Sequence, residues 1–519
     1  MANLDRDYDE VLYPSYEHAQ THPDRLSVIA MLAGMDPAPV QHCRVLELGC
    51  GDGSNLIPMA AALPHSEFVG IDRASIPITK GKDMLAALML NNISLEEFDL
   101  LDLRADVGAF DYIIVHGLYA WVPDHVKDQV MSICRTHLKP HGVAYISYNA
   151  YPGSHIADML RNMLLFHLRD VRDPKERISQ SVAFLKFLSK SQTRSSSYST
   201  LLDDELKQAL NSSTALLYHD RIGAVNTPMY FFQFMNHAAQ HGLQFLGEAD
   251  YFECQYHIYP PETAKKLEQM ANESVILKEQ YLDFLKCRRF RQTLLCRAEL
   301  KLNSRPNPRA IVNMHVASRA KPVDSAVDLS PGKVAEFVGP HGGKIATDLP
   351  VAKAALIRMA EIFPRPLAFA ELLDTARQLV GTQTSDDAEA LSSILLSIYG
   401  TGLLDLYPRA PDYVAEVGEY PMACPLVRLQ VERGSIVTNL RHITIEVNDE
   451  LGRHLLKLLD GTRNRSKLLD DLTQAVIEGN VLSDEQDATI PDTREVRETL
   501  TRGLEENLQK LAKLALLVQ

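Results

Sequence analysis

The run VLELGCGDG, residues 45–53, is an apolar strand followed at once by a loop with glycine at every second position. Glycine lets the backbone of such a loop adopt positive φ and approach a bound ligand closely. The spacing is GxGxG, not the GxGxxG of dinucleotide sites, and Glu47 stands two positions before the first glycine. A carboxylate there would repel a pyrophosphate and attract an ammonium group. The stretch therefore favours S-adenosylmethionine, whose methionine part carries an ammonium group, over NAD.

Acidic residues also follow the next two apolar segments. Asp72 ends the segment 68–72, about twenty residues past the glycine loop, where a carboxylate can accept hydrogen bonds from both ribose hydroxyls. Asp99 follows the segment 93–98 and is expected to accept a hydrogen bond from the adenine amino group, with Leu100 beside the ring. A single aspartate more often ends a strand or caps a helix. Acids at three successive strand ends nevertheless favour one ligand site.

The residues of this site resemble those of the class I S-adenosylmethionine-dependent methyltransferases over positions 1–165. ELGCGDG at 47–53 is similar to the first motif of that family, and LKPHG at 138–142 is similar to the turn before its fifth strand, although His141 stands where glycine is usual. The resemblance implies a parallel, Rossmann-like sheet that binds the methyl donor. The residues that it implies for the cofactor are Glu47, Gly49, Cys50, Gly51, Gly53, Asn55, Asp72, Arg73, Asp99, Leu100, His116 and Gly117, with His22 and Arg25 from the N-terminal segment.

Several longer sequence motifs restrict the resemblance to one group of methyltransferases. They read YPS at 13–15, THPDRL at 21–26, HGLYAWVP at 116–123 and SYNAYPG at 147–153, and the likeness continues at 231–251 and 277–296. Together they are similar to bacterial methyltransferases that carry a methyltransferase regulatory domain, a group that includes protein-lysine methyltransferases acting on outer-membrane proteins. The resemblance implies methyl transfer to a lysine-bearing protein, which would be met before its export.

Aromatic residues follow the fourth and fifth predicted strands, where the donor methyl group should emerge. Tyr119 and Trp121 come after the segment 111–115, and Tyr148 comes after 143–147. A dry channel lowers the cost of freeing a lysine amine, which is about 4–5 kcal/mol at neutral pH. Aromatic faces also attract a methylammonium by about 0.5–2 kcal/mol. We expect these residues to serve catalysis, and core packing is the alternative for each ring.

The segment 13–25 is predicted to fold over the cofactor as a lid. It contains Tyr13, Tyr16, His22 and Arg25. Tyr13 is assigned to catalysis with the other aromatic residues, and Arg25 is assigned to the methionine carboxylate. A surface or capping role is the alternative for Arg25.

The composition excludes several classes of partner. A net charge of −14 over 519 residues disfavours a polyanion such as nucleic acid, because phosphate binding depends on Lys and Arg. The seven cysteines form no CxxC pair, so neither a metal site nor a disulfide framework is predicted and a reducing cytoplasm is expected. The segment 1–10 is polar and acidic, unlike a secretory signal, and no apolar run is long enough to span a membrane.

Two other functions stay open at this point. One is a methyltransferase for a small molecule, and the other is a non-catalytic S-adenosylmethionine-binding regulator. A nucleic-acid substrate is disfavoured, because SYNAYP at 147–152 lacks the Pro-Pro-aromatic run of adenine-methylating enzymes.

The fold class predicted for the chain is α/β, a Rossmann-like class I methyltransferase fold with a helical insertion, followed by C-terminal α+β winged-helix-like domains. The predicted parts are a methyltransferase domain at 1–165, a helical insertion and regulatory or middle domain that completes the sheet at 166–302, a linker at 303–349, and winged-helix-like domains at 350–412 and 413–519. The basic residues within 286–291 are predicted on the solvated face of a helix.

The second helices of the two winged-helix-like domains are rich in acidic residues, which phosphates would repel. These residues are Glu371, Asp374, Asp470 and Asp471. Contact with protein, or formation of a homodimer, is therefore favoured over DNA reading.

Overall fold

A computed structural model describes residues 11–103, 107–191, 196–256, 258–303, 305–414, 416–478 and 493–518, apart from the side chain of His341. The expectation for 1–10 lies outside these ranges. The chain divides into two units. Unit 1 comprises Met1–Tyr16, Met35–Ala60 and Pro64–Leu302, and unit 2 comprises Glu17–Gly34, Ala61–Leu63 and Asn303–Gln519.

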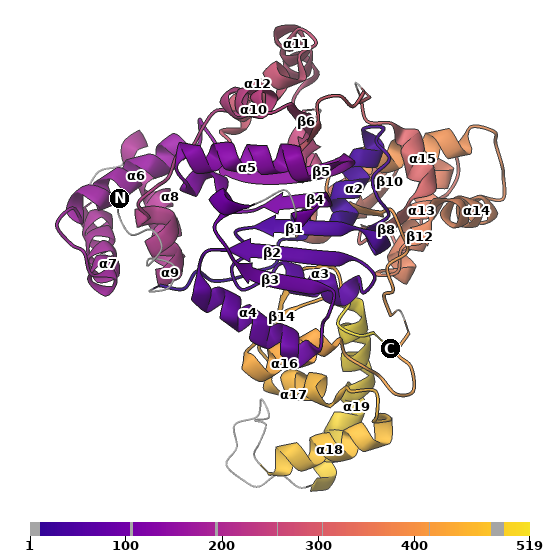
Figure 1. The fold of residues 1–519 in the computed structure, drawn as a ribbon. Helices are drawn as coiled ribbons and strands as arrows, with labels where there is room; N and C mark the ends of the chain where they lie inside the picture. The colour runs from indigo at the N-terminus through magenta and orange to yellow at the C-terminus, as the bar shows by residue number, and fades with distance from the viewer. Residues whose placement is uncertain are drawn as a thin grey trace. The chain divides into compact units, whose positions relative to one another are not determined.

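Unit 1 is built on a seven-stranded sheet in the order β3-β2-β1-β4-β5-β7-β6 (Figure 1). Strands β1 to β5 pair in parallel, and β7 is antiparallel to both β5 and β6. Every residue of β4 is buried, as expected of a central strand covered on both faces. The strands are β1 Arg44–Leu48, β2 Glu67–Asp72, β3 Ile93–Glu97, β4 Phe110–Val115, β5 Leu138–Asn149, β6 Leu243–Glu248 and β7 Phe290–Arg297. This arrangement confirms the predicted Rossmann-like methyltransferase fold.

Helices connect these strands, and further helices after β5 form an insertion. The connecting helices are α3 Leu56–Ala62, α4 Ser75–Leu88, α5 Asp124–His137, α10 Phe231–Gln240, α11 Pro261–Ala271 and α12 Val275–Lys286. The insertion after β5 consists of α6 Ser154–His167, α7 Pro174–Ser191, α8 Ser197–Asn211, α9 Thr214–Leu216 and the π-helix η6 Leu217–Arg221. It has its own core, which includes Leu164, Leu185 and Leu206. Figure 1 shows the insertion at the end of the sheet toward which the parallel strands point.

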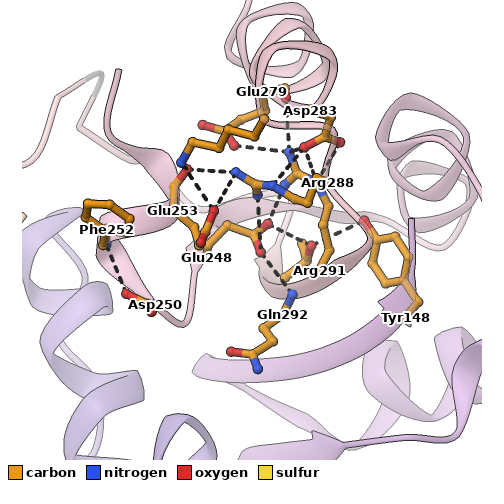
Figure 2. Close-up of polar contacts among 12 residues, drawn as sticks. Tyr148, Glu248, Asp250, Phe252, Glu253, Glu279, Asp283, Arg288, Arg291 and Gln292 are labelled. Atoms are coloured by element: carbon orange, nitrogen blue, oxygen red, sulfur yellow. Dashed lines mark hydrogen bonds and ion pairs between the residues drawn. The ribbon is translucent and has the colours of Figure 1, made fainter. Parts of the chain in front are cut away.

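A buried ion network holds the antiparallel edge of the sheet to α12 (Figure 2). The Arg291 guanidinium on β7 lies 2.5 Å from Glu248, 2.8 Å from Asp283 and 3.2 Å from Glu279. It also stands 3.8 Å from the centre of the Phe231 ring. The prediction that 286–291 forms a solvated helical face is therefore wrong. The helix ends at Lys286, and the next strand carries Arg291 into the interior, where acids compensate its charge.

Unit 2 begins with η1 Ala19–Thr21 and α2 Pro23–Leu32 and continues after residue 302 with two helix-rich modules. The first contains α13 Pro350–Ile362, α14 Phe369–Val380 and α15 Asp387–Tyr399, with strands β8 His315–Ser318, β12 Leu367–Ala368 and β13 Leu404–Tyr407. The second contains α16 Pro425–Arg433, β14 Ile436–Thr438, β15 Thr444–Glu446, α17 Glu450–Leu458, α18 Arg465–Ile477 and α19 Thr493–Lys513.

The stretch 303–349, expected to be a linker, is folded. It contains η8 Pro308–Asn313, β8, β9 Lys321–Pro322, β10 Ala335–Val338, η9 Pro340–Gly342 and β11 Lys344–Thr347. Ile311, Val316 and Phe337 are fully buried in the core of the first module. Proline, glycine and serine lie in the turns between these short strands. The composition that is typical of linkers here belongs to a folded region with many turns.

We expect Arg291→Ala to destabilise unit 1 by about 3–5 kcal/mol, because it leaves buried carboxylates without their cation. Urea unfolding followed by the fluorescence of Trp121, the single tryptophan of the chain, would measure the change. The matched control is Lys82→Ala, which removes an exposed ion pair to Glu96 and should cost less than about 1 kcal/mol. Equal midpoints for the two variants would show that the network does not stabilise the edge.

Candidate functional site

The glycine loop follows β1 at the carboxyl edge of the sheet. Gly49, Gly51 and Gly53 have φ of +78°, +56° and +76°, a region that residues with a side chain rarely adopt. The backbone N–H of Gly49 donates to the Ile71 carbonyl at 2.8 Å, and that of Gly51 donates to the Asp72 carboxylate at 2.8 Å. These bonds attach the loop to the end of β2.

Glu47 presents a buried carboxyl group below this loop. Its Oε1 accepts a hydrogen bond from Asn55 Nδ2 at 2.8 Å, and its Oε2 has no hydrogen-bond partner among the described residues. Burial raises the pKa of Glu47 to about 8, with a smaller contribution from Asp72 and Asp52. An unsatisfied buried acceptor costs about 1–3 kcal/mol. An ammonium group placed here would satisfy the oxygen and restore the negative charge.

The acids at the next two strand ends have structural partners as well. Asp72 accepts from the backbone N–H groups of Gly51 and Ala74, at 2.8 and 2.9 Å. Asp99 accepts from Leu101 N at 2.9 Å and lies 3.4 Å from Arg73 Nε. Capping uses one lone pair of a carboxylate oxygen and leaves others for a ligand. Asp99 thus caps the short helix that follows it, and Asp72 ends β2 and holds the glycine loop. Their roles toward ribose and adenine stay predictions.

Leu100, His116 and Gly117 line the same edge. Leu100 is buried. His116 Nδ1 lies 2.9 Å from the Tyr145 hydroxyl, and Gly117 N donates to Ser147 Oγ at 2.9 Å. Ser147 is a further residue of the site that sequence reasoning did not assign, although it begins the SYNAYPG arrangement. It connects the loop after β4 to the end of β5.

The N-terminal segment runs between the insertion and the glycine loop. His219 Nε2 lies 2.6 Å from the Val11 carbonyl oxygen, and Tyr13 donates its hydroxyl to the two Asp220 oxygens at 3.3 and 3.4 Å. Ser15 Oγ lies 3.8 Å from the position that a side-chain carbon on Gly51 would take. Residues 11–15 thus approach the site from one side, as a lid would.

The second half of the predicted lid belongs to unit 2. His22 is the N-cap of α2 and accepts from Asp24 N at 3.2 Å. Burial lowers its pKa to about 3, and its ring stands 5.5 Å from that of His442. The capping role accounts for His22 within unit 2. The assignments of His22 and Arg25 to the cofactor stay predictions.

Two of the predicted acceptor-channel aromatics are core residues. Tyr119 and Tyr148 are each 1% exposed, and both rings pack against Phe234. Their hydroxyls lie 2.6 Å from His237 Nδ1 and 3.3 Å from Thr293 Oγ1. Trp121 is partly exposed, and its ring lies 3.8 Å from the position that a side-chain carbon on Gly223 would take. Of the three predicted channel aromatics Tyr119, Trp121 and Tyr148, only Trp121 is partly exposed.

The sheet order, the glycine loop and the acids at successive strand ends define a class I methyltransferase. Models of protein families agree. A methyltransferase domain matches residues 46–144, a predicted methyltransferase regulatory domain matches 213–297, and the C-terminal winged helix domain of PKMT matches 419–516. The last match confirms the winged-helix character predicted for the end of the chain.

Two relatives match nearly the whole chain. The uncharacterized protein RP789 of Rickettsia prowazekii is 30% identical over 98% of this chain and 93% of its own length. The structure of PKMT2 from Rickettsia typhi is 26% identical and covers 98% of this chain and 100% of its own, with a TM-score of 0.87. The chain belongs to the S-adenosylmethionine-dependent methyltransferases that carry a methyltransferase regulatory domain and a PKMT winged helix domain.

The cofactor is S-adenosylmethionine. The structure of Rickettsia typhi PKMT2 in complex with AdoHcy has a TM-score of 0.86 to this chain at 26% identity. The buried Glu47 oxygen without a hydrogen-bond partner in the described part of the chain fits the methionine ammonium of such a ligand, and Gly51, where the nearest atom to an added side-chain carbon lies 3.8 Å away, leaves room for its close approach. When bound, S-adenosylmethionine supplies an electrophilic methyl group on a sulfonium, and these residues orient it.

We expect S-adenosylmethionine to bind with release of a proton from Glu47. Because the free carboxyl group is half protonated near pH 8, affinity should rise with pH up to that value. Glu47→Gln should lose this proton release and weaken binding at least tenfold, or about 1.4 kcal/mol. Calorimetry in buffers of different ionisation enthalpy would measure both effects.

The amino group of the ligand itself titrates, so the comparison is between variant and parent at each pH. Glu67→Gln is the matched control, because Glu67 lies at the far end of β2 in an exposed pair with Arg44. Equal proton release in Glu47→Gln and the parent would remove Glu47 from the ammonium site.

Proposed function

We propose that the protein methylates lysine side chains of a protein substrate, of the bacterial outer-membrane class. The sequence arrangements shared with such enzymes support this proposal, as does the full-length similarity to PKMT2, a designation used for protein-lysine methyltransferases. The reaction would take place in the cytoplasm, before the substrate is exported. No helix among the described residues has the length and apolar character of a membrane span.

The observation that carries the proposal is the position of Asp220. It lies in η6, in the insertion that the parallel strands point toward, and receives the Tyr13 hydroxyl. Burial raises the pKa of Asp220 to about 6. Three residues further on, Gly223 approaches the Trp121 ring. A partly buried acid among aromatic groups suits an alkylammonium.

The reaction requires a neutral amine in line with the methyl–sulfur bond. A lysine has an unperturbed pKa near 10.4, so freeing its amine at neutral pH costs about 4–5 kcal/mol. Asp220 would attract the ammonium to the site, and Trp121 and Tyr13 would exclude water around the side chain. The ammonium first gives one proton to water. The nitrogen lone pair then forms the new N–C bond and the electrons of the breaking S–C bond remain on sulfur, which leaves a methylammonium and neutral S-adenosylhomocysteine. Alignment of the two reactants supplies much of the acceleration.

We expect the protein to transfer methyl groups to polypeptides. Incubation of the purified protein with methyl-labelled S-adenosylmethionine and unfolded bacterial outer-membrane proteins should label polypeptides, and mass spectrometry should locate added mass on lysine. Acetylation of substrate lysines beforehand, which removes the nucleophilic amine, should abolish the labelling. Label confined to small molecules, or added mass on other residue types, would contradict the proposal while leaving the cofactor site intact.

Asp220→Asn should raise KM for the protein substrate about tenfold or more, because it removes a charged contact of about 1.5–3 kcal/mol. Affinity for S-adenosylmethionine should stay within about twofold of the parent. Asp204→Asn, an exposed aspartate on α8 of the same insertion, is the control. An unchanged KM in Asp220→Asn would exclude Asp220 from substrate recognition.

A further inference from the structure

A cluster of three potential metal ligands joins α5 to α10 in unit 1. Asp128 lies on α5, His237 lies on α10, and His241 follows one turn later at its end. Asp128 Oδ1 stands 3.3 Å from His237 Nε2 and 3.0 Å from His241 Nε2. One ligand atom from each residue lies within 4.8 Å of the others. Each imidazole thus directs its Nε2 atom toward the Asp128 carboxylate.

We propose that this cluster, Asp128–His237–His241, is a binding site for a divalent transition metal of the zinc class. Two imidazoles and a carboxylate are ligands that zinc prefers, and two histidines four positions apart on a helix present their rings on one face. Asp128 is exposed, with 66% of its side chain accessible. A metal held by three protein atoms would therefore keep a coordination position open to water.

The support behind His237 is typical of a metal ligand. Its Nδ1 lies 2.6 Å from the Tyr119 hydroxyl, which is buried in the core. When the phenol oxygen accepts from Nδ1–H, the Nε2 lone pair points toward Asp128 and is available to a metal. Such a second contact fixes the tautomer and the ring orientation of a ligating histidine. Tyr119, predicted to serve catalysis, here positions His237.

Charge around the cluster favours a cation. Asp128 contributes a carboxylate oxygen within hydrogen-bond distance of both imidazoles. Asp124, one turn earlier on α5, adds negative charge, although it also pairs with Lys127 at 2.9 Å. In the metal-free protein both histidines can donate Nε2–H to Asp128. Metal binding requires the other tautomer, in which the ring proton lies on Nδ1 and the Nε2 lone pair faces the metal.

No step of methyl transfer is assigned to this cluster. The expected role of the metal is to connect α5 with α10, which leads into β6 at the edge of the sheet. No metal site is predicted from the sequence, because that prediction was based on cysteine spacing and these ligands are an aspartate and two histidines. Asp128 and His237 are 109 positions apart, and only the fold brings them together.

The test uses the full chain, stripped of metal with a chelator and titrated with Zn²⁺ in a calorimeter. We expect one site and a higher melting temperature in the presence of the metal. Asp128→Asn, His237→Gln and His241→Gln should each weaken binding at least tenfold and abolish the thermal shift. His125→Gln, an exposed histidine on α5, is the matched control and should bind as the parent does.

Two further measurements test whether the metal binds at cysteines instead and whether each variant is folded. Co²⁺ in place of Zn²⁺ should give a visible spectrum without a thiolate charge-transfer band, since the chain also contains free cysteines. Melting of each variant without metal shows whether it is folded. Absence of one-site binding in the parent, a thiolate spectrum, or unchanged affinity in all three ligand variants would each overturn the proposal.

Discussion

The carboxylate of Asp72 is the interaction on which the cofactor edge depends. It ends β2, yet it accepts hydrogen bonds from Gly51 in the loop after β1 and from Ala74 at the start of the next crossover. A single side chain therefore fixes two strand ends relative to each other. Charge-assisted bonds of this kind are about twice as strong as neutral ones. The loop can then keep positive φ at its glycines and remain open, because its shape is set from the neighbouring strand.

The opposite edge of the same sheet is built differently. There the backbone turns antiparallel, and the side chains of β6, β7 and α12 form a buried group of charges around Arg291. Buried ion pairs often add little net stability compared with apolar packing, but removing one partner is costly. The network therefore acts as a constraint on which residues can occupy the edge. This edge lies within the region matched by the methyltransferase regulatory domain, residues 213–297.

Sequence reasoning was most successful where the signal was local. The glycine loop, the acids at strand ends and the first five strands are all readable from short runs, because each run contains both the strand and the residue that follows it. It failed where a role depends on distant partners. Arg291 looks like a surface residue until Glu248, Glu279 and Asp283 surround it. The turns within 303–349 look like a linker until their apolar residues meet α13. Tyr119 looks like a channel residue until Phe234 and His237 enclose it.

The early position of α2 has a consequence for how the chain can be divided. This helix precedes the glycine loop in sequence, yet Val28 and Leu32 are buried with Ile311 and Val316 in the core of the first C-terminal module. Each such side chain gains about 1.5–3 kcal/mol from burial. The C-terminal half is thus not a cassette appended behind an independent catalytic domain. A gene fragment ending near residue 302 would therefore encode α2 with its apolar side uncovered.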